Sequence, residues 1–312
     1  MTQMKAIYLA TKGGADALIS GEIVRPNPDA AQVLVKVHAT AIMPTEVHWT
    51  PTFHTQAGGP RPFPVVLGHE FSGVVAGIGP NVNGFQAGEE VFGLNDWFSN
   101  GAQAEYCVVD ETGLARKPKS INHTEAAVVP ISALTAWQAL LEKANLQRGQ
   151  RVLIHGAAGS VGIFAVQLAR WRGARVIATA SAGNLEFVRA LGADQVIDYR
   201  KTRFEDVICD VDVVFDPVGG ETLERSWKVL EPDGIVVTVA TSSGQSGDAR
   251  VRGAFMIVRA DGSQLAQIAR MIDAGELRVY LEQTFGLGEA RQAYARAGQG
   301  GMRGKVALQI IE

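Results

Sequence analysis

The sequence predicts an α/β protein with two domains, one rich in β-strands and one built on a doubly wound parallel sheet. The chain of 312 residues is long enough to form two cores. Residues 1–115 contain short β-like runs broken by Gly, Pro and Asn, whereas strand and helix patterns alternate from residue 151 to residue 240. This change of pattern along the chain predicts two domains of different architecture.

The composition is that of a compact globular protein, with 46% hydrophobic and 20% charged residues. The net charge is -3 and no long basic run occurs, so we expect no nucleic-acid partner and no membrane partner. A membrane-spanning helix needs about 20 apolar residues in a row, and no run in this sequence approaches that length. We therefore expect a cytoplasmic protein. Cys107 and Cys209 both lie in strand-like contexts, which predicts two buried thiols.

In the first domain, apolar and β-branched residues predict strands over 5–10, 32–42, 70–79, 89–94 and 104–109. The segment 50–64 holds four prolines, and we expect it to form a long loop near a site.

A helical pattern begins after Lys119, with Thr124 as its expected N-cap. Strands are then predicted over 151–155, 174–180, 195–199, 211–216 and 234–240, and helices over 160–171, 184–191, 221–230 and 262–274. The last segment, 277–310, has a β-helix-β pattern with no strand partner in the second half, so we expect it to return to the first domain. The predicted domains are 1–122 with 268–312, and 123–267.

The strongest chemical signal is the glycine-rich stretch 156–162, which joins a strand to an apolar helix. Gly156 suits the turn, Gly159 lets the backbone approach a pyrophosphate, and Gly162 allows the helix to pack closely on the strand. The spacing is Gly-x-x-Gly-x-x-Gly rather than the commoner Gly-x-Gly-x-x-Gly. This context predicts a Rossmann domain that binds a dinucleotide at the helix N-terminus. The other residues of the predicted phosphate site are Ala158, Ser160 and Val161.

The end of the second strand of this domain indicates which cofactor is bound. An NAD enzyme places Asp or Glu about 20 residues after the glycines to hold the ribose 2′-hydroxyl. Here that position is Ser181, and no carboxylate occurs in 175–184. We therefore expect NADPH, with Ser181 and Asn184 as partners of its 2′-phosphate. Tyr199 and Arg200 either flank the same phosphate or form an ordinary solvated loop.

Several motifs together resemble the medium-chain dehydrogenase/reductase superfamily, and specifically its zinc-independent quinone oxidoreductase-like branch. The resemblance covers nearly the whole chain. It rests on GHEFSGVVAGIGPNV (68–82), GEEVFG (88–93), PISALTAWQAL (130–140), HGAAGSVG (155–162), LGADQVIDY (191–199), DVVFDPVGG (212–220) and GKVAL (304–308). It implies a GroES-like β-rich catalytic domain built from both chain ends, a Rossmann domain between them, and an active site in the cleft.

The resemblance also supplies expectations for single residues and for assembly. Thr45 and Thr135 are expected to contact nicotinamide or substrate. Val218 and Lys305 lie in two of the motifs and are included among the predicted cofactor-binding residues. Dimers are usual in this family and twofold pairing is the commonest oligomer, so a homodimer is expected.

Zinc alcohol dehydrogenases of the same superfamily resemble the chain at Gly68-His69-Glu70. A catalytic zinc needs about three protein ligands, but the other two matching positions hold Met43 and Ile131, which provide no thiolate. We therefore predict no metal, and we interpret His69 as a hydrogen-bonded histidine at a strand start. His48, His69 and Glu70 are the one remaining metal possibility.

The segment 43–48 resembles the Asn-Pro-x-Asp-aromatic pattern of the quinone oxidoreductase branch, with Met43 and His48 as departures. The predicted reaction is hydride transfer from NADPH to a quinone or an enone. The predicted catalytic residues are Thr45, Glu46 and His48. His48, with a reference pKa of about 6.5, is the expected proton donor, unless it packs against Trp49 or bonds to Glu46.

The predicted substrate residues are Met43, Trp49, Phe53 and Trp97, because aromatic loop residues can form apolar walls for a flat substrate. They can equally fill a domain interface. Two rival functions are a zinc-type alcohol dehydrogenase and a non-catalytic NADPH-binding sensor or structural protein.

Overall fold

The computed structural model describes residues 2–240, 243 and 249–311. It divides into two compact units. The first unit holds residues 1–131 and 260–312, and the second unit holds residues 132–259. Both ends of the chain thus belong to one unit. The second unit, 132–259, is shorter at both ends than the predicted second domain, 123–267.

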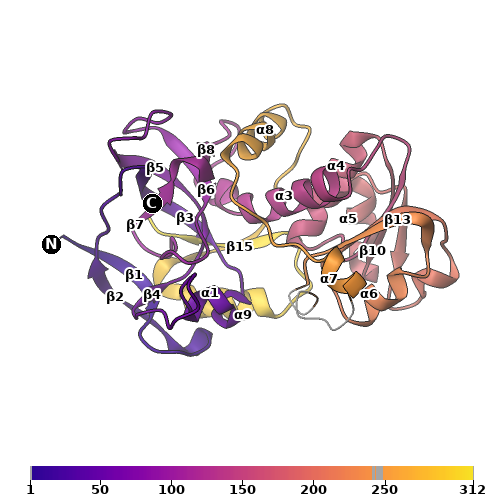
Figure 1. Ribbon diagram of the computed structural model, residues 1–312, viewed down its shortest axis with the longest axis horizontal. Helices are drawn as coiled ribbons and strands as arrows, with labels where there is room; N and C mark the ends of the chain where they lie inside the picture. Colours follow the sequence, from indigo (N-terminus) through magenta and orange to yellow (C-terminus); the bar gives the residue numbers. More distant parts are fainter. Residues whose placement is uncertain (1, 241–242, 244–248, 312) are drawn as a thin grey trace. The chain divides into compact units, whose positions relative to one another are not determined.

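The first unit contains a three-stranded sheet, in the order β2-β1-β4, and a seven-stranded sheet. The order in the larger sheet is β14-β15-β3-β5-β6-β8, with β7 also paired to β3 (Figure 1). The N-terminal strands are β1 (Gln3–Leu9), β2 (Leu18–Val24), β3 (Gln32–Ala41), β4 (Val65–Val66), β5 (Glu70–Ile78), β6 (Glu90–Leu94), β7 (Tyr106–Asp110) and β8 (Leu114–Arg116). The five strands predicted for this region are confirmed.

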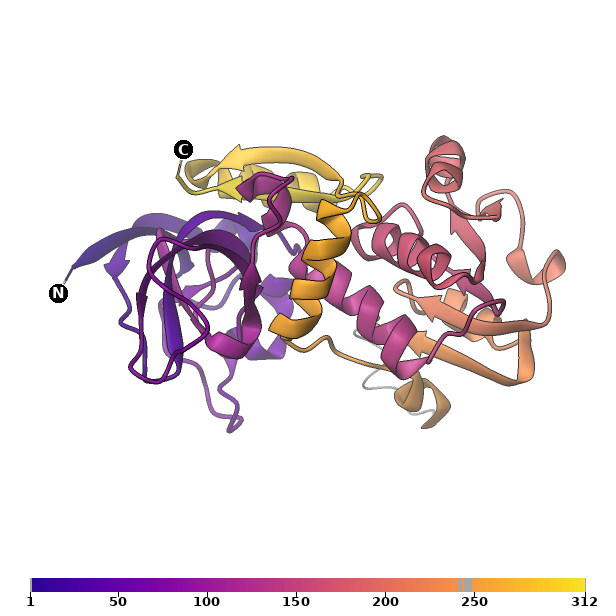
Figure 2. The same cartoon turned by 90° about the horizontal axis from the view of Figure 1, so that it is seen from above.

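The C-terminal segment returns to the first unit, as predicted. It forms β14 (Leu281–Gly286), α9 (Ala290–Gly298) and β15 (Lys305–Gln309). β15 pairs in parallel with β14 and antiparallel with β3, where Ala307 lies opposite Ala41. Figure 2 shows β14 and β15, in yellow, beside the strands of the N-terminal part. Val306 and Leu308 of β15 are buried in the same core as residues from β1 and β4.

Two helices explain why the unit boundaries differ from the prediction. α2 (His123–Ala127) packs on β3 and β5, and α8 (Gly262–Asp273) packs on β8, so both belong to the first unit. The cap of α2 is Asn122, which forms a capping box with Glu125. The predicted cap Thr124 is wrong, because its hydroxyl donates to Asn122 Oδ1 at 2.6 Å instead of capping the helix.

The second unit is a five-stranded parallel sheet in the order β11-β10-β9-β12-β13, which confirms the doubly wound prediction. Its strands are β9 (Arg151–Ile154), β10 (Arg175–Ala180), β11 (Gln195–Asp198), β12 (Val211–Asp216) and β13 (Leu230–Thr238). Its α-helices in the described residues are α3 (Pro130–Trp137, which begins in the first unit), α4 (Ser160–Arg172), α5 (Leu185–Ala190), α6 (Glu221–Ser226) and α7 (Ala249–Ala254). The strands β9, β10 and β12 are almost wholly buried, as expected for strands covered on both faces.

Three local predictions are wrong. The helix predicted to reach residue 230 ends at Ser226, because Leu230 already begins β13. Cys107 is buried in β7 as predicted, but Cys209 is exposed. The expected loop 50–64 is wrong in its first four residues, which form the short helix α1 (Thr50–Phe53), and is confirmed for residues 54–64.

Within the described part of the chain, every helix is too short or too polar to cross a lipid bilayer.

Candidate functional site

The glycine-rich turn of the second unit is shaped by its three glycines. Gly156 has φ +58°, a left-handed conformation that favours glycine. A Cβ on Gly162 would lie 2.3 Å from the carbonyl oxygen of Gly156, so only glycine lets α4 pack this closely on the turn. A Cβ on Gly159 would lie 3.2 Å from the same oxygen and would crowd the turn.

The turn leads directly into α4, and the N-terminus of this helix has no side-chain cap. Gly159 is the exposed N-cap residue, and no side chain of the cap accepts a bond from the first turn. The amides of the first helical residues Ser160, Val161 and Gly162 have no partner inside an α-helix. Backbone amides at the positive end of a helix bind phosphate. The residues therefore fit the diphosphate of a dinucleotide, and Ala158, 7% exposed, lies inside the turn.

A second turn, after β12, lies against the first. The Val218 side chain would be 3.4 Å from a Cβ on Gly156, and Val218 is 55% exposed. Asp216 holds this turn, because its buried carboxylate accepts bonds from the amides of Val218 at 2.9 Å and Gly219 at 3.0 Å. Burial raises the pKa of Asp216, and the two amides oppose that shift. The sequence prediction named Val218 but missed the aspartate that positions it.

The predicted ribose residues gather at the ends of β10 and β11. Ser181 and Asn184 form one turn, in which the Asn184 amide donates to the Ser181 carbonyl at 2.8 Å. The Tyr199 amide donates to Ala180 O at 3.3 Å, which joins the ends of the two strands. Arg200 lies 5.7 Å from the centre of the Tyr199 ring, and Tyr199 is 54% exposed. These ends and the glycine turn share the carboxyl edge of the sheet, where ligands bind in this architecture.

Thr135 differs from these residues. It lies in α3 and not at the end of a sheet strand, and it is 3% exposed.

In the first unit, the predicted catalytic Glu46 is paired with His69. Its Oε1 atom accepts the Gly68 amide at 2.8 Å and lies 2.5 Å from His69 Nδ1. His69 Nε2 lies 3.2 Å from Ser99 O, so both ring nitrogens face oxygen atoms. Glu46 and His69 are 1% and 2% exposed. The interpretation of His69 as a hydrogen-bonded histidine is confirmed, whereas Glu46 bonds to His69 and not to His48.

A second buried pair contains the predicted cofactor residue Lys305. Its Nζ contacts Glu70 Oε1, and Glu70 Oε2 accepts the Ile131 amide at 2.9 Å. Lys305 and Glu70 are 4% and 1% exposed, so the amine is held inside the first unit. Burial raises the pKa of Glu70, and Lys305 opposes that shift. The prediction did not foresee this partner for Lys305.

The remaining predicted residues of the first unit are distributed over a short segment and a loop. Trp49 and Trp97 meet edge to face, with ring centres 5.3 Å apart, and Trp97 lies 5.4 Å from the His69 ring. His48 and Thr45 are exposed, and Met43 is half-buried. Phe53 instead packs against a core cluster that includes Val47 and Ile42, so it does not join the tryptophan pair by any described contact.

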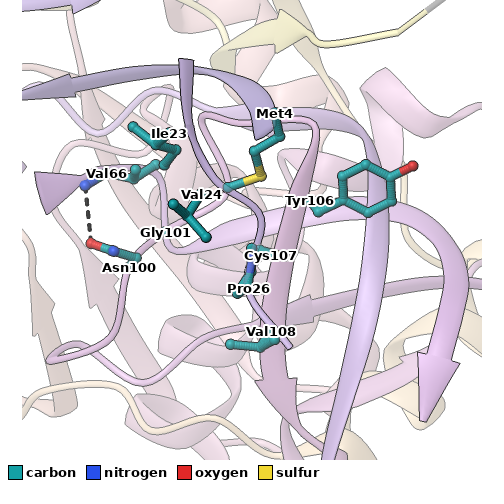
Figure 3. Close-up of a pocket in the computed structure, with 10 residues that line it drawn as sticks. All are labelled: Met4, Ile23, Val24, Pro26, Val66, Asn100, Gly101, Tyr106, Cys107 and Val108. Carbon is teal, nitrogen blue, oxygen red and sulfur yellow. Dashed lines mark hydrogen bonds between the residues drawn. The ribbon is translucent and has the colours of Figure 1, made fainter. Parts of the chain in front are cut away.

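The first unit also has a small pocket of about 50 Å³ that is partly open to solvent (Figure 3). Met4, Val24, Tyr106 and Cys107 contribute to its walls, and the Asn100 side chain accepts the Val66 amide beside it. None of the predicted substrate residues lines it. A space of this size does not hold a quinone.

In residues 2–240, 243 and 249–311, we find no group of three or more His, Cys, Asp or Glu side chains arranged to hold a metal ion. Among the predicted metal candidates, His69 bonds to Glu46 and Ser99, and Glu70 bonds to Lys305 and Ile131.

Comparison with known proteins identifies two matching family models. Residues 29–119 match the alcohol dehydrogenase GroES-like domain, and residues 191–308 match a zinc-binding dehydrogenase domain. The chain is 33% identical to the mitochondrial NAD(P)H oxidoreductase RTN4IP1 of Mus musculus, over 90% of this chain and 82% of that protein. It is 32% identical to 2-methylene-furan-3-one reductase of Solanum lycopersicum, over 99% and 80%. The solved quinone oxidoreductase of Coxiella burnetii superimposes with a TM-score of 0.90 at 29% identity, over 99% and 100% of the two chains.

Proposed function

Because the chain belongs to the medium-chain dehydrogenase/reductase superfamily and is an oxidoreductase with a nicotinamide cofactor, we propose that it is an NADPH-dependent reductase. Its substrate is a quinone or an α,β-unsaturated carbonyl compound, and the reaction uses no zinc.

The observation that carries this proposal is the turn 156–162. Its glycines leave no side chain where a diphosphate approaches the backbone, and α4 presents uncapped amides at the same place. When bound there, the cofactor supplies the hydride. The protein binds its phosphates and orients it through the neighbouring turn that contains Val218.

The preference for NADPH is supported by the end of β10. A carboxylate at this position would select the free 2′-hydroxyl of NADH and repel a phosphate. The chain has Ser181 and Asn184 there, with Tyr199 tied to the same strand end by its amide and Arg200 stacked on the Tyr199 ring.

The proposed proton donor is His48. Its imidazole is exposed and takes part in neither of the two buried pairs, Glu46 with His69 and Glu70 with Lys305. Glu46 is held by His69 and Gly68, so its proposed role is to fix the segment 45–48 and not to exchange protons with the substrate. The Trp49 and Trp97 rings provide the apolar surface that a flat quinone or enone requires. The names of the tomato reductase and of the Coxiella oxidoreductase support this substrate class.

The proposal of a zinc-free reaction rests on the donor set. Zinc prefers thiolate, imidazole or carboxylate ligands. His69 is the one such ligand at the three matching positions, because the other two are Met43 and Ile131. Elemental analysis of protein purified without chelator should find far less than one zinc per chain, and a stoichiometric zinc content would support the alcohol dehydrogenase alternative.

The direct test is NADPH oxidation with a panel of quinones, enones and saturated aldehydes. We expect turnover with the first two groups and tighter binding of NADPH than of NADH, measured by quenching of cofactor fluorescence. Cofactor binding without turnover of any of these compounds would instead support a sensor or structural role. Equal affinity for NADH and NADPH would remove the argument from Ser181.

We also propose a homodimer, since twofold pairing is the commonest closed assembly. Light scattering should then give twice the chain mass of 33.2 kDa.

A further inference from the structure

A chain of three buried polar side chains lies directly beside the glycine turn of the second unit. His155 is the residue between β9 and Gly156, and it is 1% exposed. Its Nδ1 lies 3.1 Å from Thr179 Oγ1 on β10, and its Nε2 lies 3.0 Å from Ser226 Oγ on α6. Thr179 and Ser226 are 4% and 0% exposed, so none of the three is solvated.

The hydroxyl of Ser226 settles which ring nitrogen carries the proton. Ser226 Oγ donates its single hydrogen to Thr222 O at 2.7 Å. It can therefore only accept from His155, which places the imidazole proton on Nε2. His155 Nδ1 is then the acceptor of the Thr179 hydroxyl.

The surroundings keep this imidazole neutral. The pKa of His155 is lowered to about 3, mainly by burial and also by the nearby Arg225, while Glu205 opposes the shift. Arg225 and Glu205 are paired with each other at 3.3 Å, and the ring of Phe204 covers the imidazole at 4.7 Å. Because the ring is uncharged around pH 7, Nδ1 can accept the hydrogen bond of the Thr179 hydroxyl there.

Thr179 makes two contacts with the residues around the turn. Its hydroxyl bonds to His155, and its carbonyl oxygen accepts the Ala157 amide at 3.1 Å. Hydrogen bonds thus join the end of β10 to His155, before Gly156, and to Ala157, after it. Because Gly156 has the freest backbone of the three, these two bonds define the path that the chain takes into the phosphate-binding turn.

We propose that Thr179 and His155 are positioning residues for the cofactor, which fix the turn 156–162 in the conformation that binds the diphosphate. This inference rests on the proposed function, because it assigns dinucleotide binding to that turn. Thr179 acts through the backbone of the turn, and Ser226 anchors the far side of the imidazole without contacting the turn by any described bond.

Two matched variants test the proposal, since each removes one hydroxyl partner of His155. Thr179→Val should raise the Kd for NADPH about fivefold, the loss expected for one neutral hydrogen bond, while kcat at saturating NADPH stays nearly constant. Ser226→Ala should leave the Kd near the wild-type value. Ser226→Ala removes two buried hydrogen bonds and Thr179→Val removes one, so Ser226→Ala should lose at least as much stability in urea. A loss of stability therefore cannot by itself explain weaker NADPH binding in Thr179→Val.

A cofactor-free measurement separates this inference from the proposed function. In the protein without nucleotide, hydrogen exchange of the Ala157 amide should be faster in Thr179→Val than in wild type, and unchanged in Ser226→Ala. If wild type binds no NADPH, the proposed function fails, but the exchange result still tests the positioning role.

The His155 variants provide a second comparison. The amide oxygen of His155→Asn can replace Nδ1 as acceptor of the Thr179 hydroxyl, whereas His155→Gln preserves the donor to Ser226. We expect Asn to retain NADPH affinity better than Gln. An equal effect of Thr179→Val and Ser226→Ala on affinity and on Ala157 exchange would overturn the proposal, as would a greater loss of affinity in Asn than in Gln.

Discussion

At the scale of single residues, the polar side chains of the first unit differ in burial. Four of them are buried in pairs, whereas the His48 imidazole is exposed to solvent. Glu46, His69, Glu70 and Lys305 are all at most 4% exposed and bond to one another in two pairs. His48 is two residues from Glu46 but is exposed, because the short helical turn over Glu46–His48 directs the two side chains differently. His48 is therefore the residue of this segment that we propose for acid–base catalysis.

Replacing His48 by Phe removes the proposed proton donor and preserves an aromatic ring. We expect kcat to fall about 100-fold, the lower end of what a positioned acid or base contributes. The Kd for NADPH should be unchanged, because no cofactor-binding residue is altered. His54→Phe, at the C-terminal end of α1, is the matched control and should retain activity. Steady-state kinetics and fluorescence titration measure both quantities, and an unchanged kcat in His48→Phe would exclude this donor.

Lys305 is expected to matter for folding more than for cofactor binding. Lys305→Met leaves Glu70 buried without its cation, which should lower the free energy of unfolding by about 3–5 kcal/mol. The double variant Glu70→Gln with Lys305→Met removes both charges and should recover part of that loss. Urea denaturation measures the effect. A stable Lys305→Met protein with weakened NADPH binding would restore the original prediction of a cofactor contact.

At the scale of elements, the parallel sheet of the second unit places every proposed cofactor contact at strand ends. β9 leads into the glycine turn, β10 into Ser181, β11 into Tyr199 and β12 into Val218. The buried His155 ties β9 to β10 and to α6. The stability of this arrangement should depend on pH.

The pKa of His155 falls from 6.5 to about 3 on folding because the site is buried. Between these two values the unfolded chain binds more protons at His155. The contribution of His155 to the free energy of unfolding should therefore be constant above pH 6.5 and decrease as pH falls below it. The loss should approach about 1.4 kcal/mol per pH unit over most of this range. Urea denaturation at several pH values should show this dependence in the second unit, and His155→Gln should weaken it. His54→Gln, outside this unit, should not.

At the scale of the whole molecule, two separate cores lie in the two units. Leu308 on β15 and Leu153 on β9 are both fully buried, one in each unit. Leu308→Ala and Leu153→Ala should each cost about 2–5 kcal/mol. Calorimetry should show that each variant lowers the transition of its own unit more than that of the other. Equal shifts of one common transition by both variants would contradict the independence of the cores.

Much of the fold could be predicted because its signals are local. The five parallel strands, the glycine turn and the return of 277–310 follow from hydrophobic patterning and turn residues. The predicted boundaries place α2 in the second domain and divide α8 between the two domains, whereas both helices pack on strands of the first unit. Their patterns do not show which sheet they cover. Tertiary pairings such as Glu46 with His69, or Thr179 with His155, join distant positions in the chain and have no local signal.

The position of β15 has a consequence for synthesis of the protein. β3 (Gln32–Ala41) pairs with β5 along one edge, and its other edge is shared by β7, opposite residues 32–36, and β15, opposite residues 39–41. Of these three partners, β15 alone comes from the end of the chain, at residues 305–309. The second unit is continuous from 132 to 259 and can assemble on the ribosome while that partner is still unmade. The edge of β3 at residues 39–41 therefore stays unpaired until translation is nearly finished. An unpaired strand edge can pair with another chain, so we expect the nascent first unit to be prone to association during that interval.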